Sequence, residues 1–310
     1  MRRHAEPSAG AQRTPGLPGP ANALILFASA LAIFLAGSAW IAFFPGVPTD
    51  LGGVPDLDRD ARHVKIPVVP TESLDAWYLP GTRGATVVIF HGYGRNHTRA
   101  WRYAQFLRHA GYGVLAADFR SSRATGRKPT TLGHYEMQDA RAILRWLEHD
   151  SGTHPGRIAL LGESLGGSVA IVLASEHPEI AAVVADCPFA NGQRALEDSF
   201  ERWAHVPRWP MTPIAGALAT GITGHDPRKL DAVAAATLLR GRPLFIIASK
   251  ADDRFGPSQS RDLWQAAGAR DSLWVLSDCG HNEAWGKHRA EYERRVLAFY
   301  DRALPAGRAP

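Results

Sequence analysis

The feature that most constrains this fold is a glycine–x–serine–x–glycine turn at residues 162–166. Residues 157–161 before it form a short apolar strand, and residues 165–176 after it have the composition of a buried helix. Only glycine fits two positions before and two positions after Ser164, because so tight a turn presses backbone against backbone. The turn places the Ser164 hydroxyl at a helix N-terminus, which favours negative charge. This context predicts a serine nucleophile, and the alternative is a glycine-rich turn without chemistry.

Strands and helices alternate along the chain from residue 62 onward. Alternation of this kind requires crossover connections, so it predicts an α/β fold with a mostly parallel central sheet flanked by helices. In such sheets the catalytic residues collect at the carboxyl ends of the strands. The expected strands are 63–69, 74–78, 85–90, 113–118, 157–161, 181–185, 243–248 and 272–276, and the expected helices are 100–110, 136–148, 165–176 and 288–303.

A serine nucleophile needs a base, and the chain contains 13 histidines. His281 follows Gly280 in the loop between the last expected strand and the last expected helix. An imidazole at this place can reach Ser164 in the chain order serine, acid, histidine. We therefore predict His281 as the base. The alternatives are that His281 is a solvated loop residue, or that His288, which opens a helix, serves instead.

The loop after strand 85–90 reads His-Gly-Tyr-Gly-Arg-Asn. A serine hydrolase stabilises its oxyanion with one backbone N–H from the residue after the nucleophile and one from this earlier loop. These groups are the N–H of Leu165 and the N–H of Tyr93. His91 lies before a glycine at a strand end, where a buried histidine that braces the loop is expected more often than a catalytic base.

Together these segments resemble the α/β-hydrolase superfamily, in particular bacterial prolyl-oligopeptidase-like and serine-aminopeptidase-like hydrolases with an N-terminal membrane anchor. The matching segments are HGYGRN, DFRSSRATG, the region 136–139, GESLGG, ADCPFAN, KADDRFGP and GHNE. The resemblance implies an α/β-hydrolase fold over residues 62–310, with a small helical cap at about 190–242. It also implies hydrolysis of an ester, thioester or amide through an acyl-enzyme on Ser164, without a metal or organic cofactor. Ser121 and Ser122 replace glycines of the relatives, which predicts a different pocket wall.

The triad acid follows from the register of the same resemblance. Relatives commonly carry it in the pattern H-G-x-x-D-x-x-V-P, and residues 249–257 here read SKADDRFGP. Counting back from Pro257 implies Asp253 as the acid and puts Asp252 at a variable loop position. Asp186, at the end of strand 181–185, occupies a place that some relatives use for the acid, and it is expected to brace the loop instead.

The N-terminus divides into three expected segments. Residues 1–22 are rich in Pro, Gly, Ala and Arg and predict a disordered tail, residues 23–44 predict a transmembrane signal anchor, and residues 45–61 form a linker. The alternatives for 23–44 are a cleaved signal peptide and a buried core helix. Arg2, Arg3 and Arg13 precede the apolar run. The positive-inside rule therefore predicts a single-pass membrane protein with an extracytoplasmic catalytic domain.

The composition of the chain limits which binding partners are expected. The net charge of +5 is modest, and no dense basic stripe is present, which disfavours nucleic acid as a partner. Cys187 and Cys279 have no paired Cys/His spacing, so no metal site is predicted, and either a disulfide or two buried free thiols remain open. We expect a small-molecule or lipid-like acyl substrate and no obligate protein partner. Carboxylesterase activity is favoured; the alternatives are a serine peptidase of the aminopeptidase type and a non-catalytic ligand-binding protein.

Overall fold

The structure is a computed structural model, which describes residues 19–44, 60–122, 128–203, 205, 207–268 and 272–305. The chain forms two compact units, Met1–Trp40 and Ile41–Pro310. Of the predicted tail, residues 1–18 lie outside the described residues, as do residues 45–59 of the predicted linker.

Helix α1 (Pro20–Phe43) covers nearly all of the predicted anchor at 23–44. Its large apolar side chains are widely exposed, Ile33 by 73% and Phe27 by 68%. Among the described residues, however, no helix combines the length and the hydropathy that crossing a bilayer requires. The predicted transmembrane anchor is therefore not supported, and the predicted topology stays a prediction.

The second unit is built on one eight-stranded sheet in the order β1-β2-β4-β3-β5-β6-β7-β8. The first two strands form an antiparallel hairpin, and β2 also runs antiparallel to β4. The strands β4, β3, β5, β6, β7 and β8 pair in parallel in that order. The predicted α/β-hydrolase architecture with a mostly parallel sheet is thereby confirmed. The strands are β1 (Arg62–Val69), β2 (Glu72–Leu79), β3 (Thr86–Phe90), β4 (Gly113–Ala117), β5 (Ile158–Glu163), β6 (Ile180–Asp186), β7 (Leu244–Ser249) and β8 (Leu273–Leu276).

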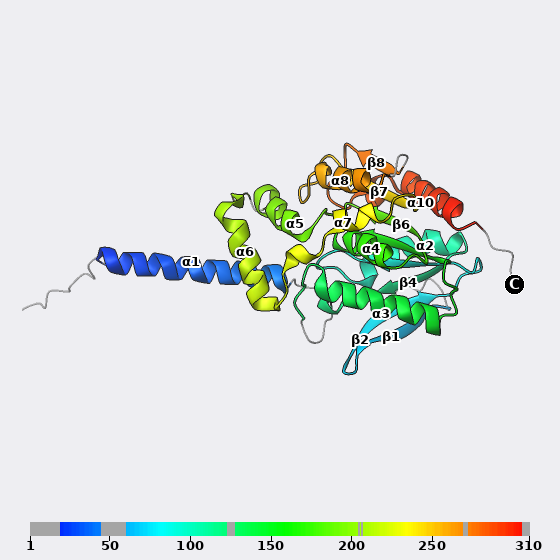
Figure 1. Cartoon of the computed structure of the whole chain (residues 1–310), viewed down its shortest axis with the longest axis horizontal. Coiled ribbons are helices and arrows are strands. Elements are labelled where there is room, and N and C mark those ends of the chain that lie inside the picture. The colour runs from blue at the N-terminus through cyan, green and yellow to red at the C-terminus, as the bar shows by residue number, and fades with distance from the viewer. Residues whose placement is uncertain are drawn as a thin grey trace, which may run out of the picture. The chain divides into compact units, whose positions relative to one another are not determined.

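Helices cover both faces of this sheet, which is why its central strands are continuous apolar runs (Figure 1). Alternate residues of β3 point to opposite faces: Val88 belongs to one core and Val87 to the other. The first core contains side chains of α3 (His134–Asp150), α4 (Leu165–Glu176), α7 (Ala232–Thr237) and α8 (Pro257–Ala267). The second contains side chains of α2 (His97–His109), α9 (Ala284–Lys287) and α10 (Arg289–Ala303).

The insertion between β6 and β7 is helical, as predicted for the cap. It consists of α5 (Gly192–Asp198), the π-helical turn η2 (Ser199–Trp203), α6 (Arg208–Thr223), the 3₁₀ turn η3 (Pro227–Lys229) and α7. A further 3₁₀ turn, η1 (Arg120–Ser122), follows β4. The sequence did not predict α8 or α9. Trp209 of the cap is 76% exposed, so this side chain is not buried against the sheet.

The connection from β5 to α4 is the tightest turn of the sheet. Ser164 adopts φ 51° and ψ −117°, and α4 begins at the next residue. A Cβ on Gly162 would lie 2.2 Å from the carbonyl oxygen of Gly166, and a Cβ on Gly166 would lie 2.3 Å from the carbonyl oxygen of Phe90. Both contacts are with backbone, which cannot move aside without breaking the sheet, so glycine is required at both positions.

We expect Gly162→Ala to lower the free energy of unfolding by more than about 2 kcal/mol, or to prevent folding, because its Cβ meets backbone atoms. Gly216→Ala is the matched control: nothing lies within 4 Å of a Cβ at this position in α6. It should change stability by less than about 1 kcal/mol, in the stabilising direction. Chemical denaturation of both variants measures the difference, and equal stabilities would contradict the steric requirement.

Candidate active site

Three side chains from three strand ends meet in a hydrogen-bonded chain. Ser164 follows β5, Asp252 follows β7 and His281 follows β8. His281 Nε2 lies 3.0 Å from Ser164 Oγ, and His281 Nδ1 lies 2.8 Å from Asp252 Oδ2. Because a carboxylate only accepts, Nδ1–H donates to Asp252 and Nε2 is left to accept from the Ser164 hydroxyl. This is the arrangement of a serine nucleophile, a general base and an orienting acid.

The aspartate in this chain is Asp252, and the register that implied Asp253 is wrong. Asp252 is 3% exposed, whereas the Asp253 side chain points into solvent. The physical reason is an Asx turn: Asp252 Oδ1 accepts from the backbone N–H of Arg254 at 2.8 Å and of Phe255 at 2.9 Å. These bonds hold the Asp252 carboxylate inside the loop with Oδ2 facing His281.

His91 braces the loop after β3, as predicted, and does not contact Ser164 within hydrogen-bond distance. Its Nδ1–H donates to the carbonyl oxygen of Gly92 at 2.8 Å, and its Nε2 accepts from Phe119 N–H at 3.0 Å. The Ser122 hydroxyl lies 2.9 Å from the same Nε2. Burial lowers the pKa of His91, so it stays neutral. Ser122, which replaces a glycine of the relatives, thus contributes to this brace.

The predicted oxyanion groups lie beside Ser164. A Cβ on Gly92 would lie 3.4 Å from Ser164 Cβ, so the backbone that leads into Tyr93 passes directly over the nucleophile. Leu165 is the first residue of α4 and is 2% exposed. This placement fits an oxyanion hole made by the two N–H groups, and their role stays a prediction.

Glu163, between the glycine and the serine of the turn, was missed by the sequence reasoning. Its carboxylate is 1% exposed, accepts from Tyr103 Oη at 2.6 Å and forms an ion pair with Arg102. Arg102 also donates to the backbone carbonyl of Asn282, at 3.5 Å, next to His281. The pair therefore connects the loop of the nucleophile to the loop of the base. A charged residue at the end of an otherwise apolar strand was the signal that could have found it.

Asp186 contributes its backbone to the site. Its carbonyl oxygen accepts from Ser164 N–H at 2.8 Å, which supports the strained turn. The carboxyl group is fully buried, and burial raises its pKa. Asp186 is thus the loop brace that was expected, although the bracing atom is a backbone oxygen.

The two cysteines are buried free thiols, which decides between the two alternatives. Cys187, Asp252 and His281 offer three ligand atoms within 4.8 Å of one another, and so do Asp278, Cys279 and His288. In the first group a metal would displace the proton that His281 donates to Asp252, and burial raises the pKa of the Cys187 thiol. Metal binding there would therefore compete with the hydrogen-bonded chain to Ser164.

Comparison with known proteins identifies the family of the chain. The sequence model of a family described as serine aminopeptidase, S33, matches residues 81–251, a range that contains Ser164 and ends just before Asp252. The chain is 28% identical to the uncharacterised protein YqkD of Bacillus subtilis, over 70% of this chain and 71% of that protein. It is 27% identical to the uncharacterised protein Rv2307c of Mycobacterium tuberculosis, over 88% of this chain and 90% of that one.

Solved structures share the fold. The esterase Pf2001 of Pyrococcus furiosus superposes with a TM-score of 0.67 at 25% identity, covering 81% of this chain and 94% of the esterase. The acylaminoacyl peptidase of Pyrococcus horikoshii superposes with a TM-score of 0.63 at 18% identity, covering 81% of this chain and 42% of that chain. The second likeness concerns the fold alone.

The two neighbouring aspartates give a direct test of the site. Asp252→Asn keeps an oxygen for the N–H groups of Arg254 and Phe255 but presents an amide N–H to His281 Nδ1, which forces the wrong imidazole tautomer. We expect kcat to fall by a factor on the order of 10⁴ with the fold preserved. Asp253→Asn, the matched control, should cost less than about tenfold, since that side chain is exposed. The measurement is kcat for ester hydrolysis by both variants. A larger loss of kcat in Asp253→Asn than in Asp252→Asn would identify Asp253 as the acid.

Proposed function

The chain belongs to the serine aminopeptidase S33 family, a family of hydrolases, and we propose that it hydrolyses carboxylic esters through an acyl-enzyme on Ser164. One observation carries this proposal: the 3.0 Å contact between Ser164 Oγ and His281 Nε2, at the tip of a strained turn between a strand and a helix. The neighbouring 2.8 Å contact with Asp252 gives the imidazole the tautomer that the reaction needs.

In the proposed mechanism His281 removes the Ser164 proton while Oγ attacks the substrate carbonyl. The N–H groups of Tyr93 and Leu165 hold the developing oxyanion, and the N-terminus of α4 adds favourable potential. Asp252 stabilises the imidazolium, which then gives its proton to the leaving alcohol. Water, activated by the same imidazole, attacks the acyl-enzyme, releases the acid and restores Ser164.

Peptide hydrolysis is the competing function, and the description of the family favours it. The same Ser164, His281 and Asp252 could cleave a thioester or an amide. An aminopeptidase must also bind the positively charged amino terminus of its substrate, which calls for carboxylates at the site. The carboxylate of Glu163, within the turn, is already paired with Arg102. A non-catalytic ligand-binding role is disfavoured because all three residues of the hydrogen-bonded chain are present.

Ser164→Ala separates a catalytic serine from the non-catalytic alternative. The variant should not react with a fluorophosphonate probe, and its kcat should be lower by about 10⁴ or more, because the attacking atom is gone. Ser175→Ala is the matched control on the same helix, since the Ser175 hydroxyl donates to the Val172 carbonyl and not to the triad. It should label and turn over as the unmodified protein does. Near-full esterase activity in Ser164→Ala would contradict the proposal.

We also propose that α1 associates with a membrane. No charged residue occurs in Pro20–Phe43, and large exposed apolar surface of this kind favours burial in lipid. Six of its large apolar side chains are at least 60% exposed: Leu24, Ile25, Leu26, Phe27, Ile33 and Phe34. The three arginines of the N-terminal tail support a cytoplasmic tail and an extracytoplasmic catalytic domain.

The double change Phe27→Asp and Phe34→Asp should move the protein from the membrane fraction to the supernatant, because two carboxylates would enter the lipid-facing surface. Leu238→Asp, at an equally exposed apolar residue outside α1, should leave the distribution unchanged.

The predicted topology has its own test. Protease added to intact cells should digest the catalytic domain. Protection until lysis would reverse the topology, and recovery of the unmodified protein in the supernatant would refute membrane association.

A further inference from the structure

Two arginines lie directly against the loop of the triad acid. Arg202, on η2 of the cap, donates from Nη2 to the backbone carbonyl of Asp252 at 2.7 Å, and its Nη1 lies 3.5 Å from a Cβ built on Gly256. Arg254 follows Asp252 by two positions and donates its backbone N–H to the Asp252 carboxylate. The guanidinium group of Arg202 thus reaches from the cap to the triad, where it meets a neutral carbonyl group instead of a carboxylate.

Arg95 approaches the site from the other side, on the loop of Tyr93. Its backbone N–H donates to the carbonyl oxygen of Gly92 at 3.2 Å, which closes the turn that passes over Ser164. The guanidinium groups of Arg99, Arg102 and Arg254 lie near it. Burial, followed by the repulsion from these three cations, lowers the pKa of Arg95. A guanidinium nevertheless remains charged at neutral pH.

The carboxylates of the site do not balance these charges. Glu163 contacts both Arg102 and, at 4.0 Å, Arg99. Asp252 is engaged by His281. Within the described part of the chain, no carboxylate lies within 4.0 Å of the guanidinium groups of Arg95 or Arg202. Arg95, on the Tyr93 loop, and Arg202, on the cap, therefore bring positive charge to the loops beside Ser164 and Asp252.

We propose that the substrate carries, besides its scissile carbonyl, an anionic oxygen group that Arg95 and Arg202 bind. The inference rests on the proposed ester hydrolysis and narrows it to a substrate class. A guanidinium without an anionic partner gains a charge-assisted hydrogen bond when a carboxylate or phosphate arrives, and the surrounding cations raise the local concentration of anions. The same field opposes the free ammonium group of an aminopeptidase substrate.

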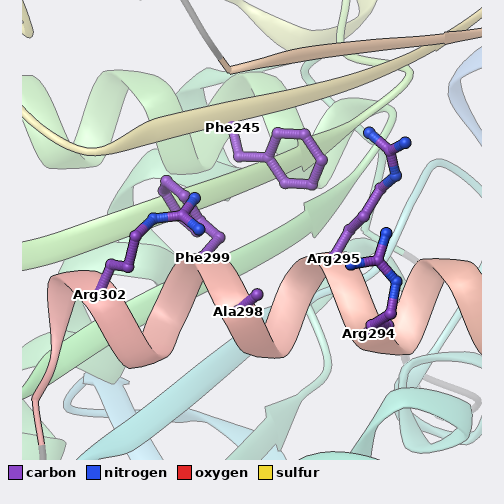
Figure 2. A pocket seen from close by; sticks show the side chains of 6 residues that line it. All are labelled: Phe245, Arg294, Arg295, Ala298, Phe299 and Arg302. Carbon is purple, nitrogen blue, oxygen red and sulfur yellow. The ribbon is translucent and has the colours of Figure 1, made fainter.

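A second arginine cluster offers a control, and Figure 2 shows it around Phe245 and Phe299. Arg302 belongs to this cluster and lies near the C-terminal end of α10. That end is tied to the amino-terminal edge of the sheet, because Asp301 pairs with Arg83 and the carbonyl of Pro305 accepts from Arg157. Ser164 lies at the opposite, carboxyl-terminal edge. Arg302→Gln therefore removes one positive charge far from the reaction.

The experiment uses the full-length protein and two pairs of esters. Mono-p-nitrophenyl adipate carries a carboxylate on the acyl side, and 3-carboxyphenyl butyrate carries one on the leaving group; each is compared with its neutral methyl ester. We expect kcat/KM to be at least about tenfold higher for the anionic member of one pair, the gain that a charge-assisted hydrogen bond gives. The pair that shows the preference identifies the side on which the anion binds. Raising the salt concentration should reduce the preference.

The variants assign the preference to named residues. Arg95→Gln and Arg202→Gln should each reduce the anionic-to-neutral ratio of kcat/KM at least about threefold, as the loss of one such contact predicts. Arg302→Gln should leave the ratio and the neutral-ester activity as they are. Equal or lower kcat/KM for both anionic esters, or an equal drop in all three variants, overturns the inference and leaves ester hydrolysis in place. Failure to turn over any of the four esters refutes the proposed function, and the inference with it.

Discussion

The backbone of Ser164 is the constraint on which the remaining structure of the site depends. A non-glycine residue at φ 51° and ψ −117° costs about 1–3 kcal/mol and persists only where its surroundings enforce it. Two neighbouring strands do so here: the Phe90 carbonyl of β3 lies where a Cβ of Gly166 would stand, and the Asp186 carbonyl of β6 accepts from Ser164 N–H. Ser164 is thus held by the packed centre of the sheet.

Parallel pairing then determines where the partners of Ser164 lie. Strands β5, β6, β7 and β8 are consecutive neighbours with the same direction, so the residues after them gather at one edge. Adjacent strands lie about 4.8 Å apart, which puts the ends of β5 and β7 about 10 Å from each other. A single imidazole bridges this gap. His281 does so although it is 117 positions from Ser164 and 29 positions from Asp252.

Two buried carboxylates near the turn have separate roles because their partners differ. Glu163 accepts from Tyr103 and pairs with Arg102, so its charge is compensated before a substrate arrives. Asp252 receives two backbone N–H groups on one oxygen and the imidazole on the other. In the proposed mechanism Asp252 therefore stabilises the imidazolium of His281. Arg102 also donates to the backbone carbonyl of Asn282, in the loop of His281.

The sequence by itself determined the order of the strands, the glycine turn around Ser164, the place of His281 and the bracing role of His91. These follow from local patterns, since apolar periodicity and glycine spacing depend on neighbours in the chain. Only the tertiary structure decided between Asp252 and Asp253, whose orientation depends on which backbone N–H groups the carboxylate caps. It also decided that Arg95 and Arg202 lie beside the loops of Ser164 and Asp252, because these arginines come from a loop and a cap that are distant in sequence. Proximity of this kind is created by folding, and no local pattern encodes it.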